Sequence, residues 1–428
     1  MRYFQRKFPV DKVEPLTAFL FLLAAVVFLY GWVYYPIVEK HSGDFLKRLR
    51  GGWSFDHTWI YWDGKGVDVY GPLFTLMDYY IHEFHLDRLV FLQGLFIFYL
   101  LLNLVTAYLL LKIFRFWNGN WLKRAWGVSL IVHFFPLVQA IKQDVIENLQ
   151  LFAIAAFLYF FSYPRKRRDL LAGASLGFGI CAKSFPLALV PYLVLRKYYK
   201  LAGVALLFFI LVVWKVSDLK GLTLWEGTRG MFLFQHALEA LNFHQNQAIS
   251  GFAYRLFCHF NYDDLSSLTH PRLSESAFIS FQVVRYLLIL CFLLVTFWRV
   301  FPIFWKIREF SAKEFVYLEV SILFAIFLLI VPHTQIHYFI LLLPAYLFLF
   351  DQFFEFPTPR REKYALIFSY LLVGFKLPLR GLDMIFPSPF ACPYIQLTNI
   401  WNFPFYGTVI LLFLLINDYR RRYRVYRC

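Results

Sequence analysis

One carboxylate stands close to the end of the first long apolar segment. Asp44 follows the apolar residues 16–37 and precedes Phe45 in a polar loop. A carboxylate in a half-buried site at a membrane boundary can accept a proton from an attacking hydroxyl group, so Asp44 is a candidate general base. The alternative is a loop carboxylate that caps a helix by bonding backbone amides.

A second polar group lies in the stretch 244–257, which contains Asn246, Gln247 and Arg255. Amides can bond to the hydroxyl groups of a sugar, and the planar guanidinium matches the oxygens of a phosphate. The alternative is an amphipathic helix at the membrane interface, with Arg255 extending its charge to the headgroups.

Two histidines, His333 and His337, lie at the junction of the predicted spans 314–331 and 337–354. Such residues near a membrane boundary can bind a phosphate, orient a sugar or bind a metal, and they can also cap a helix. One pair without a third ligand does not define a zinc site. The sequence offers no set of metal ligands, and neither a metal nor a cofactor is expected.

Three further polar residues stand at the ends of apolar segments. Lys183 is costly among apolar neighbours, so it is a functional candidate, with stabilisation of a bend or contact with headgroups as the alternative. Asn148 and Gln150 follow Glu147 where a helix should begin. This group could contact a substrate, or its acidic members could complement the helix dipole.

The composition places all these residues in a membrane protein. The chain is 60% hydrophobic and 16% charged, against about 25% charged residues in soluble domains. The formal charge of +16 is spread over short clusters between apolar segments. That pattern is typical of loops that face an anionic leaflet and argues against nucleic acid as a partner.

Hydropathy predicts an all-α, polytopic protein with about ten spanning helices, each of roughly 20 residues. No repeat or soluble domain interrupts it, so residues 1–428 form one membrane domain. The expected spans are 16–37, 89–111, 124–139, 149–163, 200–217, 277–298, 314–331, 337–354, 364–383 and 403–417.

The basic clusters decide the topology, because cytoplasmic loops collect Lys and Arg. If 170–195 crossed the bilayer, the clusters at 165–168 and 196–200 would face opposite sides. A segment that enters and returns keeps every cluster inside, and Lys183 to Pro186 supplies the helix break. We therefore expect a re-entrant pair of half helices, cytoplasmic termini and interfacial helices in the extracytoplasmic loops. The clusters are 2–7, 112–124, 165–168, 196–200, 299–313, 360–363 and 420–422.

Several stretches together resemble glycosyltransferase family 87 (DUF2029), polyprenol-phosphate-mannose-dependent α-mannosyltransferases of the GT-C superfamily. The Glu147-Asn148-Leu149-Gln150 stretch departs from the family, because its two amides are exchanged relative to Gly-Gln-x-Asn. The matching stretches are Asp44-Phe45, Tyr70-Gly71-Pro72-Leu73, Lys183-Ser184-Phe185-Pro186, Asn246 to Leu256 and Thr334-Gln335-Ile336-His337.

The resemblance implies an inverting transfer of a hexose from a polyprenyl-phosphate carrier to a lipid or glycan acceptor. Mannose is the hexose that the resemblance favours. Asp44 would accept the acceptor's proton while the lipid phosphate departs, on the extracytoplasmic side of the plasma (inner) membrane. Arg255, His337 and Lys183 would stabilise the phosphate. The remaining substrate contacts would come from Asn246, Gln247, Asn148 and Gln150.

Two other classes of protein are rivals to an enzyme. A carrier or flippase would move a lipid-linked sugar without chemistry, but transporters usually break helices at matching places in two halves. The one clear break here is at Lys183 to Pro186. A structural component of an envelope assembly would not require Asp44.

Overall fold

In the computed structural model, every regular element of the described residues is a helix. The structure describes residues 23–34, 72–73, 76, 80, 83–84, 88–118, 121–142, 147–219, 246–258, 273–307, 313–332, 334–355, 358–376, 388 and 394–427. The elements are η1 (Phe28–Tyr34), α6 (Arg88–Ile113), α7 (Trp121–Val132), α8 (Phe135–Lys142), α9 (Glu147–Phe161), α10 (Arg165–Ala182), η3 (Phe185–Ala188), α11 (Leu189–Leu195), α12 (Tyr199–Leu219), α15 (Ile249–Leu256), α17 (Glu275–Ile307), α18 (Lys313–Ile330), η4 (Ile336–Leu342), α19 (Leu343–Glu355), α20 (Arg360–Gly374), α22 (Tyr394–Ile400) and α23 (Phe403–Arg427).

The predicted all-α class is confirmed, and the number of clear spans is smaller than predicted. Within the described residues, three stretches are long and apolar enough to cross a bilayer: Gly94–Ile113, Tyr199–Leu219 and Ser276–Ile307. A fourth is possible if α7 and α8, which meet at a bend of 54°, form one span. Other expected spans correspond to helices that are shorter or interrupted, such as α9 with 15 residues.

The predicted break at Lys183 is present. Helix α10 ends at Ala182 and η3 begins at Phe185. Along α10, Gly173 packs on Val204 and Gly177 packs on Phe208, so α10 and α12 run in the same direction. The chain between them therefore returns to the level at which α10 begins. The two halves are unequal, because α10 has 18 residues and α11 has 7.

The basic clusters of the described residues gather at one end of the helix bundle. At this end Arg196 also bonds to Glu319, which accepts from Tyr192 and Tyr419. The contacts that join the clusters are Arg115 with Glu314 at 3.9 Å, Lys123 with Asp351 at 2.5 Å, Arg168 over the Tyr198 ring at 5.0 Å, Arg196 with the Ile307 carbonyl at 2.6 Å, and Arg421 with Glu362 at 2.6 Å. This grouping is the one predicted for loops on a single side of a membrane.

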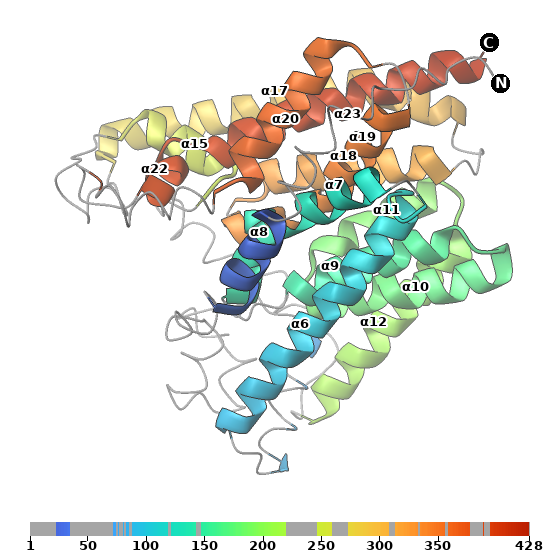
Figure 1. Cartoon of the computed structure of the whole chain (residues 1–428). Coiled ribbons are helices and arrows are strands. Elements are labelled where there is room, and N and C mark those ends of the chain that lie inside the picture. The colour runs from blue at the N-terminus through green and yellow to red at the C-terminus, as the bar shows by residue number, and fades with distance from the viewer. Residues whose placement is uncertain are drawn as a thin grey trace.

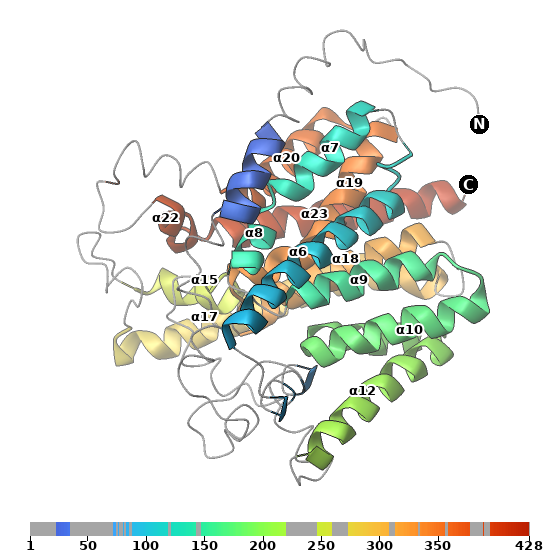
Figure 2. The same ribbon diagram turned by 60° about the horizontal axis from the view of Figure 1, so that its bottom comes forward.

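The short helices α15 and α22 lie at the other end of α23. Figures 1 and 2 both show α15 and α22 together at the left, away from the C-terminal end of α23 at the right. With 25 residues, α23 is about 37 Å long. The distance between the two ends is therefore comparable with the thickness of a bilayer.

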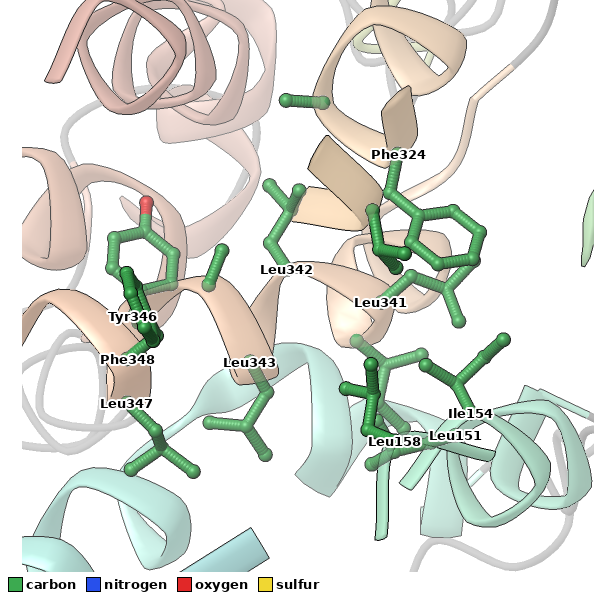
Figure 3. Close-up of a cluster of buried hydrophobic side chains, with 14 of the residues drawn as sticks. Leu151, Ile154, Leu158, Phe324, Leu341, Leu342, Leu343, Tyr346, Leu347 and Phe348 are labelled. Carbon is green, nitrogen blue, oxygen red and sulfur yellow. The ribbon is translucent and has the colours of Figure 1, made fainter. Parts of the chain in front are cut away.

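The centre of the molecule is an apolar core formed by α9, α18, η4 and α19. Figure 3 shows Phe324 of α18 and Leu341 of η4 beside Ile154 and Leu158 of α9. All four side chains are at most 2% exposed. This packing fixes the start of α9 against the segment that precedes η4, where most of the predicted site residues meet.

Candidate functional site

Residues 332 and 334–338 link two groups of predicted site residues. They follow α18 and lead into η4, which packs on α8 and α9. On one side the Gln247 backbone N–H donates to the Thr334 carbonyl at 2.8 Å, and the Thr334 N–H donates to Asn246 Oδ1 at 3.2 Å. On the other side His337 reaches α9. The structure therefore brings these residues together, although they are far apart in the sequence.

One group is a buried cluster of charges around Glu147. Lys183 Nζ donates to Glu147 Oε1, and His337 Nε2 lies 3.6 Å from the same oxygen. The Lys183 ammonium also lies over the Tyr338 ring, 3.9 Å from its centroid. Glu147, Lys183 and His337 are each at most 4% exposed, so the carboxylate, the ammonium and the imidazole meet inside the protein.

The ion pair keeps Glu147 and Lys183 charged despite their burial. Burial alone would raise the pKa of Glu147, but the charges of Lys183 and His337 and the Lys183 hydrogen bond lower it below its ordinary value. Burial opposes the charge of Lys183 in the same way, and the interactions with Glu147 and Tyr338 raise its pKa. Contact of Lys183 with headgroups is therefore wrong as an interpretation, whereas support of the bend agrees with the structure.

The two predicted amides of α9 have different surroundings. Asn148 Nδ2 donates to the Ala140 carbonyl at 3.1 Å, and Asn148 Oδ1 accepts from Asn103 at 2.9 Å. Asn148 thus joins α9 to α6 and α8. Gln150 Nε2 donates to the Lys183 carbonyl at 3.0 Å and so holds the break after α10.

Two buried oxygen atoms at this cluster accept no hydrogen bond from the described residues. Neither Glu147 Oε2 nor Gln150 Oε1 has a hydrogen-bond partner within the part of the chain that the structure describes. Both residues lie on the first turn of α9, next to Lys183. Buried acceptors are usually satisfied, so these two atoms are suited to accept hydrogen bonds from ligand hydroxyl groups.

The second group is built on α15. Asn246 Nδ2 donates to the Pro332 carbonyl at 3.0 Å, and Arg255 donates to the Asn246 carbonyl at 2.5 Å. A Cβ at Gly251 would lie only 2.2 Å from that Asn246 carbonyl oxygen. The close turn before α15 therefore requires glycine at position 251.

Arg255 is enclosed by protein. Its side chain also donates to Asn402 Oδ1 in the turn between α22 and α23. Arg255 is 7% exposed, so the alternative in which it extends to the headgroups is wrong. Burial lowers the pKa of Arg255 to about 9, and the guanidinium remains protonated at neutral pH.

Several members of these groups were not predicted from the sequence. The place of Glu147 at a helix start does not indicate that it pairs with Lys183. Asn402, Asn399 and Lys376 are also outside the predicted set, although Lys376 Nζ donates to Asn399 Oδ1 at 2.7 Å. The signal for Lys376 was a charged residue inside an apolar segment.

Asp44 and His333 lie outside the described residues. The assignment of Asp44 as general base therefore remains a prediction. Of the other predicted site residues, Lys183 and His337 meet at Glu147, while Asn246, Gln247 and Arg255 meet around the turn before α15. Both groups lie at the ends of α9, α18 and α23 that are far from the basic clusters.

Comparison with known proteins assigns a family to the chain. No curated protein matches it. The family model of glycosyltransferase family 87 matches residues 69–332, which include Lys183, Asn246 and Arg255, whereas Asp44 and His337 lie on either side of the match. Since the match covers more than half of the 428 residues, the chain belongs to glycosyltransferase family 87 and is a glycosyltransferase.

Proposed function

We propose that this glycosyltransferase moves a hexose, with mannose as the first candidate, from a polyprenyl-phosphate carrier to a lipid or glycan acceptor. The observation that carries the proposal is the burial of Lys183, His337 and Arg255 in two linked groups, in a chain of this family. Basic side chains that donate hydrogen bonds suit an anionic leaving group that departs from within the protein.

The transfer would be a single inverting displacement. Asp44 would accept the proton of the acceptor hydroxyl as its oxygen attacks the anomeric carbon, and the bond from that carbon to the carrier phosphate would break. Phosphate is a good leaving group, so one carboxylate suffices where a glycosidase needs two. Arg255, His337 and Lys183 would stabilise the charge that grows on the phosphate.

Amide side chains would orient the sugar. Gln150 supports this role most directly, because its Oε1 is a buried acceptor with no partner among the described residues. Glu147 Oε2 is a second such acceptor on the same helix turn. Asn246, Gln247 and Asn148 would complete the substrate contacts while they hold the surrounding backbone in place.

The proposed setting is the plasma (inner) membrane, with a GT-C architecture. About ten spans, a re-entrant segment at 170–195 and cytoplasmic termini would place the basic clusters inside. The two linked groups would then face the extracytoplasmic side, where lipid-linked sugars and their acceptors would meet.

Replacement of Asp44 tests the reaction. Membranes that contain Asp44→Asn or Asp44→Ala are expected to transfer sugar from a labelled polyprenyl-phosphate mannose at least about 100-fold more slowly than wild type. Asp56→Asn, in the same loop, is the matched control and should keep its activity. Full transfer by both Asp44 variants, or movement of the lipid-linked sugar without a glycosidic product, would contradict the proposal.

A further inference from the structure

Lys376 is a buried lysine just after the end of α20. It is 1% exposed. Nζ donates to Asn399 Oδ1 at 2.7 Å, and this neutral amide oxygen is its one hydrogen-bond acceptor in the described structure. No carboxylate among the described residues forms an ion pair with it.

Other buried lysines of the chain are held differently. Lys183 pairs with Glu147, and Lys123 Nζ lies 2.5 Å from Asp351 Oδ1. A buried charge without an opposite charge destabilises a fold, whereas a paired charge recovers much of the lost hydration. Stability of the fold therefore accounts for Lys123 and Lys183 but not for Lys376.

The acceptors of Lys376 and Arg255 lie three positions apart in the sequence. Asn399, near the end of α22, accepts from Lys376, and Asn402, in the turn that follows α22, accepts from Arg255. Gln247 also donates to the end of α22, from Nε2 to the Asn399 carbonyl at 2.9 Å. Two basic side chains are thus held next to the end of α22 by amide oxygens, which orient them.

We propose that Lys376 is a second cation of the phosphate site, alongside Arg255, and binds the phosphate group of a lipid-phosphate substrate. The inference rests on the proposed function, because the carrier would supply the phosphate. A phosphate has the charge and the acceptor oxygens to bind both side chains, and the ammonium has two further protons to donate.

Binding of farnesyl phosphate to the full-length protein in lipid nanodiscs tests this role, with farnesol as the uncharged control. Lys376→Met is expected to weaken farnesyl phosphate binding about ten- to hundredfold and to leave farnesol binding unchanged. Its melting temperature should equal or exceed that of wild type, because the variant removes a buried polar group that has no counter-charge among the described residues. The matched control Lys123→Met separates a buried lysine from its carboxylate, so it should melt lower and bind normally.

A second variant supplies the missing counter-charge. Asn399→Asp should raise the melting temperature and weaken farnesyl phosphate binding, because its carboxylate would occupy the Lys376 ammonium. Wild-type affinity for farnesyl phosphate in both variants would overturn the inference. So would a wild-type protein that binds farnesyl phosphate no better than farnesol or inorganic phosphate. Full sugar transfer by the Asp44 variants would contradict the proposed reaction, and this outcome is distinct from the binding results for Lys376.

Discussion

At the scale of single residues, the two carboxylate oxygens of Glu147 have different surroundings. One of its oxygens faces both Lys183 and His337, and its other oxygen has no partner among the described residues. Such a carboxylate positions two basic side chains with one oxygen and has a second oxygen that could accept a hydrogen bond from a ligand. Its removal should therefore affect stability and substrate binding together.

Glu147→Gln is expected to destabilise the protein by about 3 kcal/mol, because it leaves Lys183 buried without its counter-charge. Thermal unfolding in detergent measures this loss. The double variant Glu147→Gln with Lys183→Met should recover most of the stability, because no buried charge then remains from the pair. A double variant as unstable as the single one would show that the pair does not couple.

The same ion pair sets a pH range for stability. The folded pKa of Glu147 lies below its ordinary value, so its contribution is present above about pH 4.3 and is lost as the pH falls through the folded pKa. The raised pKa of Lys183 keeps its contribution below about pH 10.4, and it is lost as the pH rises through the folded pKa. Melting temperatures from about pH 3 to pH 11 should therefore fall more steeply at both ends in wild type than in the double variant.

At the scale of elements, glycines set the contact between α10 and α12. A Cβ at Gly177 would lie 2.7 Å from the Phe208 Cβ and 2.8 Å from the Ala205 carbonyl oxygen. Small residues allow such close approach between helices in membranes. This contact aligns α10 with α12.

Gly177→Ala is expected to cost about 1–3 kcal/mol, because backbone atoms of α12 would have to move. Gly203→Ala is the matched control on α12, where a Cβ would meet no atom within 4 Å. It should be neutral or stabilising by up to about 1 kcal/mol, through helix propensity. Thermal unfolding compares the two variants, and equal stability would mean that the helices do not pack as described.

At the scale of the whole molecule, the two ends have different chemistry. One end gathers basic clusters that are joined by ion pairs, and the other gathers the polar residues of the site. Labelling of single cysteines with a membrane-impermeant maleimide tests which end faces the cytoplasm. In a cysteine-free background, Ser274→Cys should react in intact cells and Ser162→Cys only after permeabilisation; both serines are exposed. The reverse pattern would invert the topology.

The sequence predicted the helices better than the contacts between them. Apolar length placed α6, α12 and α17, and the basic clusters predicted the return near Lys183. Sequence could not show that α7 and α8 are bent, or that Glu147 meets Lys183, which is 36 positions away. Such pairings depend on helix rotation and packing, which hydropathy does not specify. The motif around Arg255 predicts a site residue there, whereas no motif in the sequence marks its partner Asn402.

Gly251 has a consequence for how motifs in this chain and its relatives should be compared. A side chain at position 251 would displace the Asn246 carbonyl that accepts from Arg255, so no other residue fits there, although glycine takes no part in the chemistry. Glycine at this position therefore indicates that the turn before α15 can form. A relative that keeps arginine but replaces this glycine should therefore have a differently shaped turn, and the arginine alone would be a poor guide to shared substrate.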